Sequence, residues 1–595
     1  MKKIIYIYLI ITGLLGTATS CSDLLDAPTK SSMDESVIFS TPVLAEKAIA
    51  GVLQSFAETN SYRGRYLPNY GFNTDCEVYN DLKSYTVEKT RLCNYNANAS
   101  NTEMNTANNA WAKFYEGIER ANLAIRGLRL YGDVENNAEL AQILGEVITL
   151  RAVLYCDLLK AWGDVPERFN PINSETIYLP RSDRDVIYKQ LLADLEEASE
   201  LVAWPTQSTV TLSTQRVNKA FVKGLRARIA LAAGGYGQRP DGQVRLSSDP
   251  DLSHEKMFAL VKEECLDVIN SGTCHLASTF EELFKNDFCG ETLRAGREIL
   301  WEIPFSEGRG RVIYNLGVRH TNTDKYTQQA QGGVNGPNPI MWYEYDPADG
   351  RREVTCVPYQ WTNGIQEPRS LGSWCFGKYR YEWLPRVVVS SNDDGLNWLY
   401  MRYADVILMA AEVINDIDGP AAAAPYLKMI RDRAFPDYPE KVNTFMQKAT
   451  ASKTAFFNAI VDERALEFTG EMLRKGDLIR WNLLKEKLTE ASGKLQRLEN
   501  REGEYADLPA NIYYKNDGEQ VIIYGLEHGQ TDAAGSLLKY PYNKSWTMSS
   551  SSDAISYWDA LFVRDPNTQQ YWPIWQVFTE ASNGTLDNIG YNPGN

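Results

Sequence analysis

Apolar side chains recur at steps of three and four residues along much of the chain, and this spacing constrains the fold more than any other feature. One such set, which shares a single helical face, comprises Trp111, Phe114, Ile118, Ala121 and Ile125. Comparable helical segments run over 145–162, 185–201, 217–229, 254–269, 399–415, 421–434, 453–468 and 473–488. The sequence therefore predicts a mostly α-helical protein.

The pairing of these helices favours helical hairpins of the tetratricopeptide type, although the 34-residue period and full consensus of that repeat are absent. Residues 273–397 differ: Gly, Pro, Asn, Trp and Tyr dominate, with short strand-like pieces. Residues 489–560 read as irregular. We therefore predict a helical N-terminal part over 38–272 and a C-terminal part over 273–595, in which a loop-rich subdomain with short strands joins further helices.

The N-terminus has the pattern of an exported lipoprotein. After two lysines, residues 4–15 are almost wholly apolar, which suits a signal peptide and is too short to span a bilayer as a helix. Small residues at 18–20 directly precede Cys21, whose sulfur can take a diacylglycerol. We predict a signal peptide at 1–20 and a lipid-anchored tether at 21–37. The alternative is a plain secretory signal followed by an incidental cysteine.

Charge and cysteine content exclude several classes of function. The net charge of −16 repels nucleic acid, so we expect no nucleic-acid partner. The eight cysteines after Cys21 show no CxxC pair or zinc spacing, and the four histidines lie far apart. We predict no metal site and no cofactor. Some cysteines could pair in an oxidising compartment, for example Cys76 with Cys93.

Several longer motifs occur in a characteristic order. They are LLKAWGDVP at 158–166, YMRYADVILM at 400–409, IVDERALEFTGEMLRKGDLIRW at 460–481, YWPI at 571–574 and NIGY at 588–591. Together with the lipoprotein start, these motifs resemble those of the SusD/RagB-type lipoproteins. Two departures are Trp575, where the family usually has proline, and residues 489–545, which match no family pattern.

The resemblance implies four tetratricopeptide-like helix pairs and a loop-rich subdomain. It also implies a lipid-anchored, surface-facing protein of the outer membrane that binds a glycan and passes it to a SusC-like TonB-dependent transporter. A peptide- or other nutrient-capturing lid of the same transporter type is the alternative.

Catalytic motifs are weak, and we predict that the protein is not an enzyme. Glu463 and Glu471 could be read as a glycosidase pair, which needs two carboxyls about 5 to 10 Å apart. Eight residues along a helix separate them by about 12 Å, and the arginines beside them would keep both ionised. The charges at helical spacing around them predict an ion-pair ladder instead.

The 14 tryptophans and 34 tyrosines suggest a sugar-binding surface, because sugar rings stack on aromatic faces while their hydroxyls bond amides and carboxylates. Trp111, Trp162, Trp301 and Trp481 lie within helix or strand motifs and are predicted core. Two clusters lie in loops instead. The early cluster includes Asn73, Asp75, Tyr79, Asn80 and Tyr85. The middle cluster includes Trp342, Tyr343, Tyr345, Tyr359, Trp361 and Trp374.

We expect the two clusters to converge on one exposed concave surface, as ligand-contacting loops do in the family. Trp342, Trp361 or Trp374 would then stack on the sugar, and Asn73, Asp75 or Asn80 would bond its hydroxyls. The alternative is that these side chains only pack.

Overall fold

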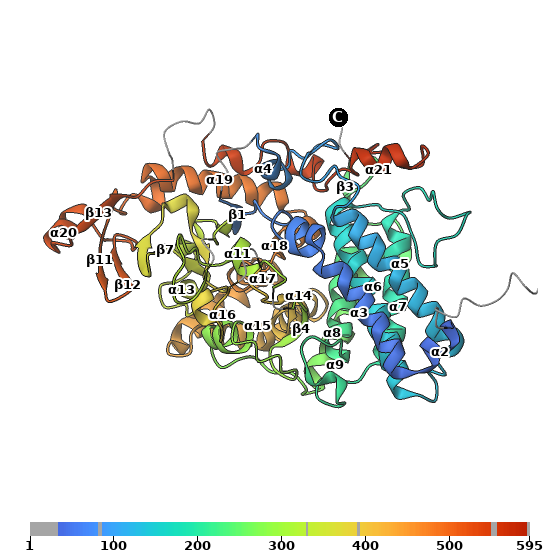
Figure 1. Ribbon diagram of the computed structural model, residues 1–595. Helices are drawn as coiled ribbons and strands as arrows, with labels where there is room; N and C mark the ends of the chain where they lie inside the picture. The colour runs from blue at the N-terminus through green and yellow to red at the C-terminus, as the bar shows by residue number, and fades with distance from the viewer. Residues whose placement is uncertain are drawn as a thin grey trace, which may run out of the picture.

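Long amphipathic helices form one half of the protein, on the right of Figure 1. The computed structural model describes residues 34–80, 86–306, 308–328, 331–389, 393–548 and 556–591. The predicted signal peptide, the lipid site Cys21 and the ligand residue Tyr85 lie outside these residues. Within them, no helix is both long and apolar enough to cross a membrane.

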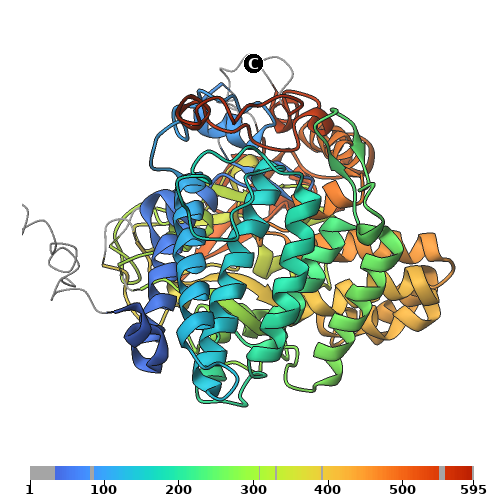
Figure 2. The same ribbon diagram turned by 90° about the vertical axis from the view of Figure 1, so that its right-hand side faces the viewer.

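The helices of this half pack in chain order. They are α3 (Pro42–Ala57), α5 (Ala110–Tyr131), α6 (Ala138–Trp162), α7 (Arg184–Leu201), α8 (Lys219–Ala233) and α9 (His254–Asn270). From α5 to α9, each helix contacts the one before it, and Figure 2 shows them as neighbouring columns. Asn109, Asn137 and Asn218 cap α5, α6 and α8, since each side chain accepts a bond from a backbone N–H of the first turn.

The stack continues after an excursion of more than a hundred residues. Helix α14 (Tyr403–Asp418) packs on α8 and α9 and is followed by α15 (Pro420–Ala434), α16 (Pro439–Ala449) and α17 (Lys453–Phe468). The expectation of one helix from 399 was wrong: Trp398–Arg402 forms strand β10, which pairs antiparallel with β4 (Ile299–Ile303). The largest hydrophobic cluster therefore contains residues from both sides of the boundary predicted between residues 272 and 273.

The region after α17 also departs from the prediction. The single helix expected at 473–488 is two, α18 (Arg474–Arg480) and α19 (Leu484–Asn500). Much of the segment read as irregular is regular: β11 (Asn511–Asp517) pairs with both β12 (Gln520–Tyr524) and β13 (Tyr542–Ser545). Apolar residues of α19 recur every three or four positions and are buried, namely Leu484, Leu488, Ala491, Leu495 and Leu498.

Short elements connect the long helices, and many of them, such as β7 and α13, lie in the loop-rich region on the left of Figure 1. Strand β1 (Glu77–Tyr79) pairs with β5 (Asn335–Pro337), β6 (Cys356–Val357) with β9 (Cys375–Phe376), β7 (Tyr359–Thr362) with β8 (Ile365–Pro368), and β2 (Gly237–Gln238) with β3 (Val244–Arg245). The short α-helices are α2 (Glu35–Ser40), α4 (Glu88–Cys93), α10 (Phe280–Glu282), α11 (Val312–Leu316), α12 (Met341–Glu344), α13 (Arg352–Thr355), α20 (Asp532–Leu537) and α21 (Gln576–Ala581). The predicted fold class, mostly helical with a loop-rich part containing short strands, is confirmed.

The burial of the tryptophans and cysteines tests two further predictions. Trp111, Trp162 and Trp301 are core residues as predicted, whereas Trp481 is only partly buried. The eight described cysteines are all free and buried, so the possible Cys76–Cys93 pair is not formed.

The predicted charge ladder of α17 is a buried network. Glu467 pairs with Arg351, Arg402 and Arg433, and none of its side chain is exposed. The two carboxylates considered as a glycosidase pair belong to the same network. Arg351 and Arg431 hold Glu463, while Lys378 and Arg402 hold Glu471. Both are buried behind their cations and are not placed to flank a sugar.

Candidate functional site

The two predicted ligand clusters meet through strand pairing. Strand β1 of the early cluster pairs with β5, which directly precedes the middle cluster. The amide Nδ2 of Asn80 then donates to the carbonyl of Trp374 at 3.0 Å. The clusters are therefore neighbours, but they do not share one concave surface: Asp75 lines one pocket, and Trp342 and Trp361 line another.

Most of the early cluster already serves the fold. The Asn73 side chain has no exposed surface; its Nδ2 donates to the Leu561 carbonyl and its Oδ1 accepts from the Tyr79 backbone N–H, both at 3.0 Å. Tyr79 is buried, and Asn80 also bonds the Gly333 carbonyl. Both polar atoms of the Asn73 side chain are therefore bonded within the fold, and Asn73 is corrected to a structural residue of this loop.

A hollow of about 660 Å³ lies beside the middle cluster, and we call it the Trp361 hollow. Its aromatic lining consists of Tyr326, Trp342, Tyr359, Trp361 and Trp383. Its polar lining includes five carboxylates, two cations and two amides: Glu281, Glu353, Glu382, Glu519, Glu527, Lys285, Arg380, Gln366 and Gln520. Its size falls within the usual range for small-molecule sites, roughly 300–1,000 Å³.

A tight hairpin places two of the rings. Asn363 and Gly364 connect β7 to β8, with φ of 51° and 77°, and this left-handed pair suits the right-handed twist of a two-residue hairpin. The turn fixes the register, in which Trp361 lies opposite Gln366. Because side chains alternate along a strand, Tyr359 and Trp361 project to the same face. Both line the hollow, as does Gln366.

The rings differ in how far they reach the opening. Trp342 and Trp361 are only 5% and 4% exposed, so they form the floor. Tyr326, Tyr359 and Trp383 are only partly buried. Trp374 is not part of the lining: it has no exposed surface and packs against Trp342 and Trp546, with ring centroids 5.5 and 5.7 Å apart. Its assignment as a stacking platform is therefore corrected to packing.

Arg380 organises the more exposed rings. Its guanidinium lies 4.3 Å from the centroid of the Trp383 ring, and its Nη1 donates to the Tyr359 hydroxyl at 2.8 Å. Its Nε donates to the Gly377 carbonyl at 2.7 Å. Burial raises the pKa of Tyr359 to about 12, so the hydroxyl stays neutral. The sequence reasoning missed Arg380, Trp383 and Tyr326, although all three lie in the aromatic-rich region 273–397.

The opposite wall comes from strand β12 and its flanking turns, in the segment read as irregular. The Gln366 backbone N–H donates to the Glu519 carbonyl, and its side-chain oxygen accepts from the Val521 N–H at 3.1 Å. These bonds attach β12 to the β7–β8 hairpin.

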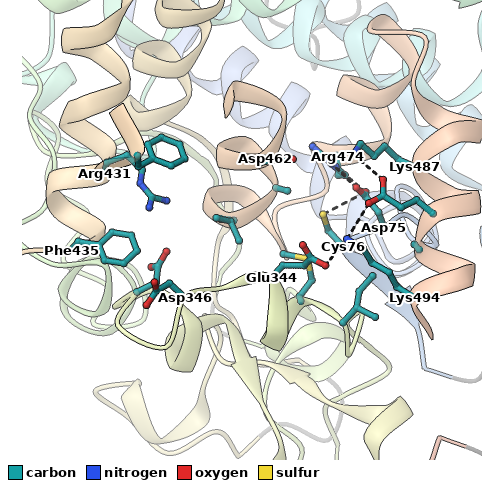
Figure 3. Close-up of a pocket in the computed structure, with 18 residues that line it drawn as sticks. Asp75, Cys76, Glu344, Asp346, Arg431, Phe435, Asp462, Arg474, Lys487 and Lys494 are labelled. Atoms are coloured by element: carbon teal, nitrogen blue, oxygen red, sulfur yellow. Dashed lines mark hydrogen bonds and ion pairs between the residues drawn. The ribbon is translucent and has the colours of Figure 1, made fainter. Parts of the chain in front are cut away.

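A second, more charged pocket of about 400 Å³ lies between α12, α17 and α19 (Figure 3). Asp75 and Arg474 form a bidentate ion pair on one side: the Nε of Arg474 donates to Asp75 Oδ1 at 2.9 Å, and its Nη2 donates to Oδ2 at 2.6 Å. Burial alone would raise the pKa of Asp75, but Arg474 holds it below its usual value. Arg431 and Phe435 lie on the other side (Figure 3). Tyr343, also a predicted ligand residue, lines neither pocket and meets Tyr505 and His528 edge-on.

Comparisons with known proteins match most of the chain. A family model described as the SusD family matches residues 377–591, and one described as starch-binding associating with outer membrane matches residues 23–231. A SusD-like protein of Formosa agariphila is 24% identical over 505 residues, covering 81% of this chain and 90% of the relative. A second SusD-like protein of that bacterium is 24% identical over 527 residues, covering 83% and 94%.

Solved structures share the fold. A SusD homologue from Bacteroides thetaiotaomicron superposes with a TM-score of 0.65 at 19% identity, covering 78% of this chain and 91% of that one. Surface glycan-binding protein A from the same bacterium, in complex with laminarihexaose, superposes with a TM-score of 0.60 at 18% identity, covering 92% and 99%.

Proposed function

The chain belongs to the SusD/RagB family, and we propose on that basis that it captures a glycan in the Trp361 hollow. One observation carries the proposal: five aromatic rings line a single hollow together with carboxylates and amides. A sugar presents the matching chemistry, an apolar C–H face and a rim of hydroxyls. In this arrangement Tyr359, Trp383 and Tyr326 meet the sugar, and Trp342 and Trp361 form the floor.

The family also bears on where the protein acts. It is associated with the outer membrane. As part of the proposal, Cys21 carries the lipid, the body faces the cell exterior, and the captured glycan passes to a SusC-like TonB-dependent transporter. SusD-like proteins are binding proteins, and capture of this kind requires no covalent chemistry from the hollow.

Titration calorimetry with a panel of neutral oligosaccharides, laminarihexaose included, tests the proposal. We expect binding by the protein, and a loss of about 1–3 kcal/mol in Trp383→Ala, taking base stacking on aromatic rings as the scale. Tyr438→Ala is the matched control, because that ring is 42% exposed and does not line the hollow. Equal affinity in both variants, or no binding by any oligosaccharide, would contradict the proposal.

The charged pocket favours a second candidate, capture of a ligand that carries both charges, such as a short peptide. Arg431, which also pairs with Glu463, lines this pocket, and among the described residues no cation forms an ion pair with the exposed Asp462 carboxylate. In this candidate the two side chains meet a carboxylate and an ammonium of the ligand. Calorimetry with short peptides, repeated in Asp462→Asn, separates this candidate from glycan capture, because Trp383→Ala should leave it unchanged.

A further inference from the structure

A buried histidine stacks against the floor of the Trp361 hollow. His320, in the loop between α11 and β5, has no exposed surface, and its ring lies parallel to that of Trp361 with centroids 5.7 Å apart. The backbone joins the two segments as well: the Trp361 N–H donates to the Arg319 carbonyl, and the Thr321 N–H donates to the Trp361 carbonyl, both at 2.8 Å. The position of Trp361 is therefore tied to this loop.

Two carboxylates flank the imidazole. Its Nδ1 lies 2.5 Å from Asp324 Oδ2, and its Nε2 lies 3.6 Å from Glu382 Oε2. Neither Nε2 nor that Oε2 has a hydrogen-bond partner among the described residues. The other oxygen of Glu382, Oε1, accepts from the indole Nε1 of Trp361 at 3.3 Å. Glu382 thus connects the histidine to the floor of the hollow, and it also lines the hollow itself.

This arrangement favours the doubly protonated ring. Burial alone would lower the pKa of His320, but Asp324 and Glu382 outweigh burial and raise it. Burial would likewise raise the pKa of Glu382, but His320 and Arg380 lower it. Two further aromatic rings, those of Tyr326 and Tyr381, meet it edge-on. Lys325 is exposed and pairs with Glu519 instead.

We propose that His320 is a positioning residue of the hollow: as an imidazolium it holds Glu382, and through it Trp361, in the orientation that the ligand meets, so that affinity falls as the pH rises. A neutral ring cannot donate to both carboxylates. If Asp324 keeps the Nδ1 proton, the lone pair of Nε2 faces Glu382 Oε2, and repulsion displaces the carboxylate that the Trp361 indole also bonds. The proposal rests on glycan capture in this hollow.

Histidine NMR tests the charge without any ligand. The sequence has four histidines, and labelled imidazole signals report on each of them. We expect the midpoint of His320 to lie above the ordinary histidine value of about 6.5, and Glu382→Gln to move it down. Glu519→Gln, a rim carboxylate paired with Lys325, is the matched control and should leave the midpoint in place. A midpoint at or below about 6.5, or one unmoved by Glu382→Gln, would overturn the proposal.

Ligand titration tests the positioning role. With laminarihexaose as the probe, or whichever oligosaccharide of the panel binds, the dissociation constant should rise about threefold to tenfold from about pH 6 to about pH 9, the size of one weakened hydrogen bond. Glu382→Gln removes the carboxylate through which the ring acts, so the dissociation constant of this variant should depend little on pH. A flat profile in the unaltered protein would refute the role even if His320 titrates as expected. Absence of binding at every pH would refute glycan capture and the role with it, while the NMR result still decides the charge.

Discussion

The buried network around Glu467 and the Trp361 hollow use the same charged residue types in opposite ways. Glu467 is enclosed by three arginines and has no exposed surface. In the hollow, Glu382 has one oxygen on the Trp361 indole and the other 3.6 Å from a histidine nitrogen. A carboxylate whose hydrogen-bonding capacity is filled by arginines stabilises the fold, whereas one with an open oxygen can respond to a proton or a ligand.

Weakening the network around Glu467 should have the largest effect on the stability of the protein. Glu467→Gln removes the charge that Arg351, Arg402 and Arg433 share, leaving buried guanidinium groups undercompensated. Removing one partner of a buried ion pair destabilises a protein by about 3–5 kcal/mol. We expect a large fall in Tm by calorimetry, with ligand affinity unchanged at temperatures where the variant is folded. An unchanged Tm would mean that the network does not differ from the hollow as we infer.

A buried acid that forms no ion pair with any described cation sharpens the comparison. Strand β4 carries Glu302, which accepts from Thr214 and Asn397, and burial raises its pKa from 4.5 to about 7. The folded state therefore favours the protonated form, and Glu302 costs stability progressively as the pH rises from 4.5 to about 7.

Glu302→Gln should then stabilise the protein by about 3 kcal/mol at pH 8, from the energy of a pKa shift, and by little at pH 5. Thermal melts of both proteins across that range check it. A gain in Tm that does not depend on pH would show that the carboxylate does not titrate.

The smallest effect, a change in ligand affinity, is expected from a substitution at the rim of the Trp361 hollow. Arg380→Lys keeps the charge but loses the planar group that lies on Trp383 and bonds both the Tyr359 hydroxyl and the Gly377 carbonyl. We expect ligand affinity to fall by about 1 kcal/mol, the worth of a typical hydrogen bond, with little change in Tm. Arg245→Lys is the control for effects that any arginine-to-lysine change would have, because Arg245 forms an exposed ion pair with Asp241. An equal change in affinity in both variants would remove Arg380 from the site.

The sequence predicted most helices because each keeps an apolar face of regular period. It failed at Trp398–Arg402, where all five residues are buried, so the strand shows no alternation and reads as part of the next helix. In the site, Trp342 and Trp361 line a hollow, and their role in ligand binding stays a prediction. Trp374 and Asn73 do not, because loop residues of these types also satisfy packing and backbone bonds. The β12 wall could not be foreseen, since only tertiary contacts bring it to the β7–β8 hairpin.

The chain order of the hollow's walls has a consequence for folding. Helices α5 to α9 contact their sequence neighbours, so each can pack early, at a small cost in loop closure. The lining of the Trp361 hollow extends from Glu281 to Glu527. A chain in which strand β12 has not yet docked can therefore hold the helical stack and the Trp361 hairpin, but it lacks the second wall, and the capacity to bind arises only late in folding.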